Sequence, residues 1–399
     1  MPPIRRILHH MIWPFIYLSY LSLFIFGLTD NVRGPLFPEI LKEFAVSDTM
    51  GSAMFAISSA SGVCASFFAR HLLRRYNRRS VLQGASCALI FALIGLATSP
   101  NFYVFLFFSV LFGSSLGIIG LIPNVLVAMG SSPERKQQLL SGLHSMYGIA
   151  SFLSPILAAS VQYLTGSWRY TFAVLIIAPI MLIYYSNHKS HHSLHQKPQP
   201  QSDSNKKDRR KNLKPQLYMA SMLSFCVAAE ILISSRLALF MRRTWHYDME
   251  QSSLYVTYFF ISMLIGRLLF TVIKLKTSIP NQLTVSAILS AFCIAMGALV
   301  HPLFLPVVGF TIAPYYPLSI TWISTKFPDD LDTAVSYMMT IDSVMLVVMH
   351  LGVGKLTDHF GIAKALLIGP VFLLISLILV NCFEYFFERE KRTKPSSGI

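Results

Sequence analysis

Residues 217–240 read LYMASMLSFCVAAEILISSRLALF, an apolar run with Glu230 near its middle and Arg236 towards its end. About 20 such residues in a helix cross the hydrocarbon core of a bilayer. Charge is costly at that depth, so an ionisable residue there usually faces a water-filled cavity or a partner. Asp342 holds a similar position in the apolar run 334–354. These two carboxylates make a transport pathway the first hypothesis.

Comparable apolar runs recur along the whole chain, in which 54% of the residues are hydrophobic and 13% are charged. Strands of a membrane barrel would be about half as long and would alternate in polarity, so the runs predict helices. The fold class predicted is an all-α polytopic membrane protein, with twelve transmembrane helices in two six-helix bundles. The expected spans are 11–31, 51–68, 81–99, 102–129, 139–164, 170–185, 217–240, 254–273, 283–300, 303–324, 334–354 and 365–383.

One clearly polar stretch, residues 187–216, separates six of these runs from the other six. It is basic and contains proline, and such a composition cannot bury a core. We expect an N-terminal bundle over 1–186, a cytoplasmic linker over 187–216 and a C-terminal bundle over 217–399. A faint repeat supports the two halves, because Leu164-Thr-Gly166 aligns with His359-Phe-Gly361 after a shift of 195 residues. Parallel halves of six helices are typical of one large transporter fold.

The charge distribution predicts the orientation in the membrane. The chain has 33 Lys and Arg against 18 Asp and Glu, a formal net charge of +15. With the N-terminus inside, 24 of the 33 basic residues lie on the cytoplasmic side. This is the positive-inside pattern, and it predicts a plasma (inner) membrane protein with both termini in the cytoplasm. Basic clusters at this face favour contact with anionic lipid rather than nucleic acid. We expect a monomer without a cofactor.

Several motifs resemble the major facilitator superfamily. The loop Arg70-His-Leu-Leu-Arg74-Arg-Tyr-Asn77-Arg-Arg79 is similar to the family's signature Gly-x-Leu-x-Asp-Arg-x-Gly-Arg-Arg, with Arg70, Arg74 and Asn77 replacing Gly, Asp and Gly. The segments 166–172 and 354–361 are also similar to the family. The resemblance covers essentially the full length and implies alternating access of two helical halves.

Within that superfamily, two stretches resemble the fucose-permease-like branch. They are Leu143-His144-x-x-Tyr147-Gly148 and Gly309-x-x-x-x-Pro314-x-x-Pro317. The chain departs from the branch in helix four, where Asn124 follows Gly-Leu-Ile-Pro and no Glu precedes it. The proton-coupling scheme of that branch therefore does not transfer directly.

Position along each run gives an approximate depth. Glu230 and Asp342 fall near the midplane, where apolar surroundings disfavour the charged form of a carboxyl group and favour proton exchange near neutral pH. Either is a candidate for proton coupling or for binding a cationic group of a substrate. The alternative for each is a carboxyl group that is merely hydrogen-bonded, to Ser234 or Tyr337 for instance.

The remaining candidates form an outer and an inner tier. In the outer tier, Asp30, Arg33 and Arg236 are candidates for a gate or for binding an anionic substrate. The alternative is a static ion pair at the helix end near water. In the inner tier, His144, Tyr147 and Asn124 are candidates for substrate binding or proton coupling. Arg267 is interpreted as a structural or gating residue.

The function predicted is a proton-coupled secondary transporter, a symporter of a small polar solute, with H⁺ or Na⁺ as the coupling ion. The alternative is an exporter of amphipathic, drug-like compounds by proton antiport. A metal transporter or a non-transporting membrane sensor is favoured less. The feature that supports metal binding is the group His188, His191, His192 and His195 in the linker. No protease, hydrolase or nucleotide-binding motif is present, so we expect no enzyme.

Overall fold

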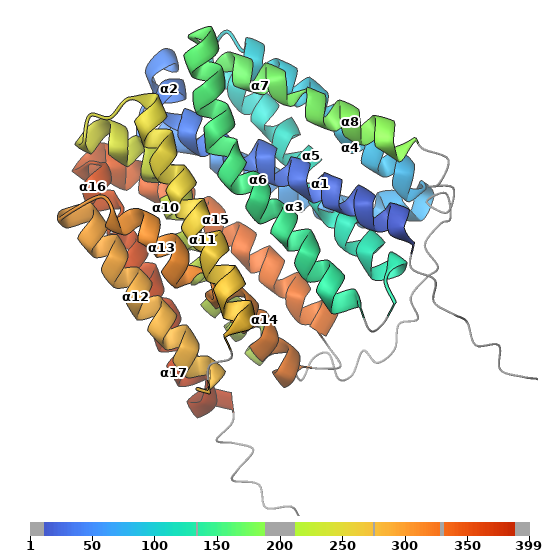
Figure 1. Cartoon of the computed structure of the whole chain (residues 1–399), viewed down its shortest axis with the longest axis vertical. Helices are drawn as coiled ribbons and strands as arrows, with labels where there is room; N and C mark the ends of the chain where they lie inside the picture. Colours follow the sequence, from blue (N-terminus) through green and yellow to red (C-terminus); the bar gives the residue numbers. More distant parts are fainter. Residues whose placement is uncertain (1–11, 133–134, 188–211, 274–275, 328–330, 388–399) are drawn as a thin grey trace, which may run out of the picture. The chain divides into compact units, whose positions relative to one another are not determined.

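The computed structural model describes residues 12–132, 135–187, 212–273, 276–327 and 331–387, and every regular element in these ranges is a helix. Twelve of its stretches are long and apolar enough to span a membrane, which confirms the all-α polytopic fold (Figure 1). The helices of the first part of the chain are α1 (Trp13–Asn31), α2 (Arg33–Phe44), α3 (Asp48–Arg75), α4 (Arg78–Thr98), α5 (Phe102–Gly130), α6 (Lys136–Thr165), α7 (Arg169–Leu175) and α8 (Ile177–Ser186). Those of the second part are α10 (Leu213–Thr244), α11 (Met249–Val272), α12 (Ile279–Leu299), α13 (Phe304–Ile312), α14 (Tyr315–Lys326), α15 (Leu331–Phe360), α16 (Ile362–Ala365) and α17 (Ile368–Phe387).

Four spans consist of two helices each: α1 with α2, α7 with α8, α13 with α14, and α16 with α17. The α13–α14 break falls at Pro314, which precedes the first residue of α14 and lacks the backbone donor that would continue the ladder. The first span runs to Phe44, beyond the predicted end at Asn31. The sequence misled here because Arg33 looks like a boundary, whereas its side chain is only 9% exposed.

The chain divides into two compact units that do not follow the sequence midpoint. The first comprises Met1–Val32 and Ser61–Gln199, and the second Arg33–Ala60 and Pro200–Ile399. The second half of the first span and the start of α3 therefore belong with the C-terminal helices. Residues 188–211 of the predicted linker, with its histidines, lie outside the described residues, and α10 already begins at Leu213. The predicted bundle boundaries stay a prediction.

The first unit is held by small-residue contacts and an aromatic cluster. Phe105 lies against Trp168 and Phe172, with ring centroids 6.1 and 6.2 Å away. At Gly62 and Gly117, α3 and α5 approach so closely that a Cβ on Gly62 would lie 3.0 Å from the Gly113 carbonyl oxygen. Glycines are needed there because any side chain would force the two backbones apart.

The second unit is built around α10, which packs against α2, α11, α15 and α17. Residues 232–241 of α10 are all buried, so this helix is the core of the unit. The segment Arg33–Ala60 approaches it at backbone distance, since a Cβ on Gly34 would lie 2.9 Å from the Ser234 carbonyl oxygen. On α15, a Cβ on Gly354 would lie 2.8 Å from the Asp48 carbonyl oxygen. Figure 1 also shows α12 and α17 side by side at the edge of this unit.

Candidate functional site

The two predicted midplane carboxylates both lie in the second unit, but their surroundings differ. Glu230 on α10 forms an ion pair with Arg267 of α11, at 3.6 Å between Oε1 and Nη2. Its side chain is 18% exposed and that of Arg267 is 31% exposed. Glu230 therefore has a compensating charge, and the sequence had not connected it with Arg267.

Asp342 on α15 has a hydroxyl partner instead of a cation. Ser224 of α10 lies with its Oγ 2.6 Å from Oδ1 of Asp342. The same hydroxyl is 2.8 Å from the carbonyl oxygen of Ala220. Asp342 takes part in none of the ion pairs among the described residues. The carboxyl group is thus half-buried without a compensating charge.

A buried cationic cluster lies further along α10, around Arg236. Its side chain is 1% exposed, and its guanidinium carbon lies 4.4 Å from the ring centroid of Phe37 and 4.8 Å from that of Phe55. Nη2 donates to Ser52 Oγ at 2.9 Å and lies 3.4 Å from Nδ1 of His350. These partners come from α2, α3 and α15, so Arg236 is the centre of their packing.

Arg33 and His350 complete this cluster through Phe55. The guanidinium carbon of Arg33 lies 5.2 Å from the Phe55 ring centroid, and the ring of His350 stacks on the same phenyl ring at 4.9 Å. Two arginines and a histidine are therefore gathered around one aromatic side chain. Cation–π attraction of this kind is worth about 0.5 to 2 kcal/mol.

Ionic and capping contacts hold the α2–α3 turn at the end of the unit beyond this cluster. The carboxylate of Asp358, near the end of α15, accepts hydrogen bonds from the backbone N–H of Asp48 and of Thr49, at 2.8 and 2.9 Å. It therefore caps the N-terminus of α3 from another helix. Arg243 pairs with Asp48 at 2.6 Å, and Arg242 pairs with Glu39.

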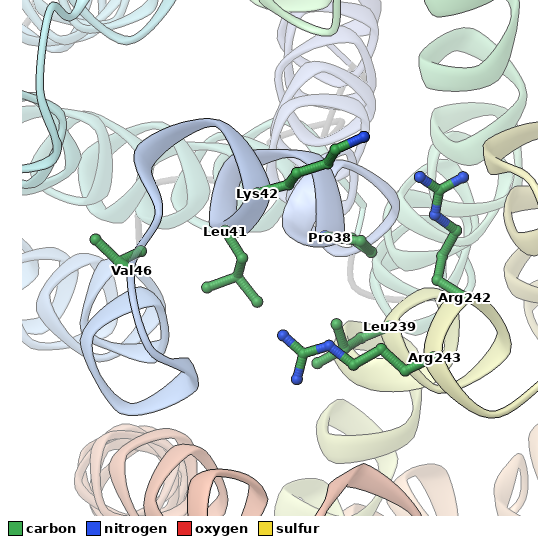
Figure 2. Close-up of a pocket in the computed structure, with 7 residues that line it drawn as sticks. All are labelled: Pro38, Leu41, Lys42, Val46, Leu239, Arg242 and Arg243. Atoms are coloured by element: carbon green, nitrogen blue, oxygen red, sulfur yellow. The ribbon is translucent and has the colours of Figure 1, made fainter. Parts of the chain in front are cut away.

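Beside these ion pairs is a pocket of about 270 Å³ between α2 and α10. Figure 2 shows its side chains, which include three cations and four apolar residues: Lys42, Arg242, Arg243, Pro38, Leu41, Val46 and Leu239. Two of the three cations are already paired with carboxylates, so the pocket is a partly neutralised recess beside the α2–α3 turn.

The inner-tier candidates and Asp30 belong to the first unit. Asn124 on α5 donates from Nδ2 to the Gly120 carbonyl oxygen of its own helix at 2.9 Å. Tyr147 on α6 packs against Phe26, with ring centroids 5.6 Å apart, while His144 is exposed. Their functions stay predictions. Among the described residues, no three His, Cys, Asp or Glu side chains lie close enough together to hold a metal ion.

Several residues of the site carried no clear sequence signal. Ser224, Ser52, Phe37 and Phe55 are residue types that occur throughout the apolar runs, and only their packing partners distinguish them. Asp358 lies in the family-like segment 354–361, but its capping of α3 joins residues about 310 positions apart and has no local sequence signal.

The comparisons with known proteins agree with this architecture. The family model described as the Major Facilitator Superfamily matches residues 19–348. Protein TsgA homolog of Buchnera aphidicola subsp. Baizongia pistaciae is 21% identical over 379 residues, 92% of this chain and 94% of that protein. Bypass of stop codon protein 6 of Saccharomyces cerevisiae is 30% identical over 161 residues, 39% of this chain, and the match spans 31% of the yeast protein's length.

Solved transporters share the fold. A bacterial homolog of the human lysosomal transporter Spinster, inward-facing and unoccupied, has a TM-score of 0.74 at 12% identity, with 97% of this chain and 98% of that chain covered. A D-xylose-proton symporter has a TM-score of 0.69 at 15% identity, with 94% and 98% covered. With the family model matched over most of its length, the chain belongs to the Major Facilitator Superfamily and is a membrane transporter rather than an enzyme.

Proposed function

We propose that the protein is a secondary transporter that couples the movement of a small polar solute to protons, with Asp342 as the proton-carrying residue. The observations that support this most directly are the contact of Asp342 with Ser224 and its absence from the ion pairs of the described residues. An ionised carboxylate without a compensating charge is costly in apolar surroundings, and gaining a proton removes that cost.

The geometry around Ser224 allows a hydrogen bond to Asp342 in both protonation states of the carboxyl group. A hydroxyl has one hydrogen to donate, and the Ala220 carbonyl and the Asp342 carboxyl both lie within hydrogen-bond distance of it. When Asp342 is protonated, its O–H donates to Ser224 Oγ while the hydroxyl donates to Ala220. When Asp342 is ionised, rotation of the hydroxyl lets Ser224 donate to the carboxylate. Asp342 therefore keeps a hydrogen bond in either state.

Glu230 is the weaker candidate for the proton-carrying residue. Its ion pair with Arg267 compensates the charge, so the ionised form is already accommodated. We assign this pair to binding the solute or to positioning α10 against α11.

The α2–α3 turn is the proposed outer gate. Its polar contacts with α10 and α15 include the Asp358 cap and two ion pairs, which are partly exposed and individually weak. Such contacts can break and reform at modest cost, as a gate requires. Alternating access would then release the segment Arg33–Ala60 from α10 and α15 while the solute site opens.

The test is transport in proteoliposomes with an imposed pH gradient, using sugars, nucleosides, small carboxylates and lipophilic cations as solutes. For the solute that the wild type accumulates, we expect Asp342→Asn to abolish proton-driven uptake but to keep exchange of labelled for unlabelled solute. Exchange survives because a permanently neutral side chain still permits the loaded protein to reorient. Glu230→Gln is the comparison variant: whatever its effect on solute affinity, the uptake that remains should still be driven by the pH gradient.

Two outcomes would contradict the proposal. Full proton-driven uptake by Asp342→Asn would remove Asp342 from the coupling step. Efflux of unrelated lipophilic cations, with no polar solute accumulated, would instead support the exporter of amphipathic compounds.

A further inference from the structure

Arg236 is a buried cation without an acidic partner. None of the ion pairs among the described residues includes it, although it lies within a membrane-spanning helix and is 1% exposed. Asp48, on the segment that covers it, pairs with Arg243 instead. One of its nitrogens, Nη1, is buried without a hydrogen-bond partner. A buried charge in this state normally costs several kcal/mol, so packing alone is a poor reason to retain it.

What surrounds Arg236 compensates for its charge only in part. The faces of Phe37 and Phe55 supply cation–π attraction, while Ser52 Oγ and His350 Nδ1 lie within reach of Nη2. A carboxylate or phosphate would compensate the charge better, because two of its oxygens can accept from a planar guanidinium at once.

Three of the four side chains around Arg236 come from one segment. Phe37 lies on α2, and Ser52 and Phe55 lie on the first part of α3, so all three belong to Arg33–Ala60. His350 comes from α15. If the segment moves away from α10, Arg236 loses both aromatic rings and Ser52 together. The nitrogen atoms freed by this movement then need an acceptor.

We propose that Arg236, assisted by Arg33, binds the carboxylate or phosphate group of the transported solute when the segment Arg33–Ala60 leaves α10. The two rings occupy the cation's faces while no solute is bound, and the anion replaces them in the open state. This proposal rests on the proposed transport function and narrows its substrate class to small organic anions or phosphate. Arg33 is the second cation because its guanidinium lies over the same Phe55 ring.

The test is the thermal unfolding midpoint of the whole protein in nanodiscs of neutral phosphatidylcholine. The probes are lactate, succinate, inorganic phosphate and glycerol phosphate, with glycerol and glucose as neutral controls. A ligand that binds only the folded protein raises the midpoint by mass action, so at least one anion and neither neutral probe should raise it. A carboxylate-only response and a phosphate-only response both support the site and identify its ligand. Absence of a response to every anion overturns the proposal.

The variant arm compares Arg236→Met with Lys214→Met, an exposed cation at the other end of the same helix, outside both the cluster and the proposed gate. Since Arg236→Met removes an uncompensated buried charge, its midpoint without anion should equal or exceed that of the wild type. Its affinity for the responding anion should fall about 10- to 100-fold. Lys214→Met should keep the wild-type affinity.

Three outcomes separate this proposal from its competitors. A lower midpoint for Arg236→Met with unchanged anion affinity would make Arg236 a structural residue and overturn the proposal. A response only when anionic lipid replaces phosphatidylcholine would mean that a lipid headgroup is bound, which overturns the solute assignment. If a neutral solute alone is accumulated and Asp342→Asn abolishes its coupling, the transport function stands and this inference fails. The wild-type measurement decides the question even if a variant does not fold.

Discussion

At the residue scale, the ion pair of Glu230 with Arg267 is expected to contribute little to the free energy of unfolding. The two groups are 3.6 Å apart and both are partly exposed, and we expect their exposed sides to face water, which weakens the attraction. We predict that a double-mutant cycle with Glu230→Gln and Arg267→Gln gives a coupling free energy of about 0.2 to 1 kcal/mol. Denaturant unfolding of the four proteins in one detergent measures it.

The same cycle has an informative contrary outcome. A coupling free energy well above 1 kcal/mol would mean that the pair is desolvated in the bilayer, and that removing one partner leaves a buried charge. Glu230 would then equal Asp342 as a candidate for the proton-coupling residue. Arg242 with Glu39, a pair at the helix end, provides the reference cycle.

At the scale of the element, α15 and α3 come into close contact at Gly354, within the second unit. A Cβ on Gly354 would lie 2.6 Å from Ser52 Oγ and 2.8 Å from the Asp48 carbonyl oxygen. Contacts this short force the helices apart. We predict that Gly354→Ala raises the rate at which a maleimide labels a cysteine placed at Leu36, which is fully buried, in a protein freed of its native cysteines.

The neighbouring Gly352 supplies the matched control. A Cβ there would meet nothing within 4 Å, so Gly352→Ala should leave the labelling rate unchanged. Equal labelling of both variants at the wild-type rate would show that α3 does not separate from α15 when the contact is strained. The proposed outer gate would then need another moving part.

The membrane-spanning helices show which features the sequence predicts and which it does not. Hydrophobic runs give the spans to within a few residues, because length and polarity alone decide whether a helix can cross a bilayer. The first span is the exception, since Arg33 looks like a terminus in sequence and is buried in the structure. Burial of Arg33 depends on Phe55, which lies on another helix. Pairings such as Asp342 with Ser224 depend on tertiary packing in the same way, and no periodicity reveals them.

At the scale of the whole molecule, the distribution of basic residues predicts which side of the membrane each loop faces. Of the 33 Lys and Arg, 24 fall on the side of the termini, in the loops that include Arg78 and Arg79. Lys42 lies near the C-terminal end of the first span, close to the α2–α3 turn. The positive-inside rule therefore predicts that the turn lies outside the cell and that the α3–α4 loop lies in the cytoplasm.

Single cysteines test this prediction in intact cells. Lys42 and Tyr76 are both exposed, and each lies close to one of the two turns, so a cysteine at either position is accessible to reagents. In a background without the native cysteines, a membrane-impermeant maleimide should label Lys42→Cys directly and Tyr76→Cys only after permeabilisation. The reverse pattern would invert the topology. Asp358 and the ion pairs formed by Arg242 and Arg243 would then lie on the cytoplasmic side. The proposed gate would control release of the solute into the cell instead of its entry from outside.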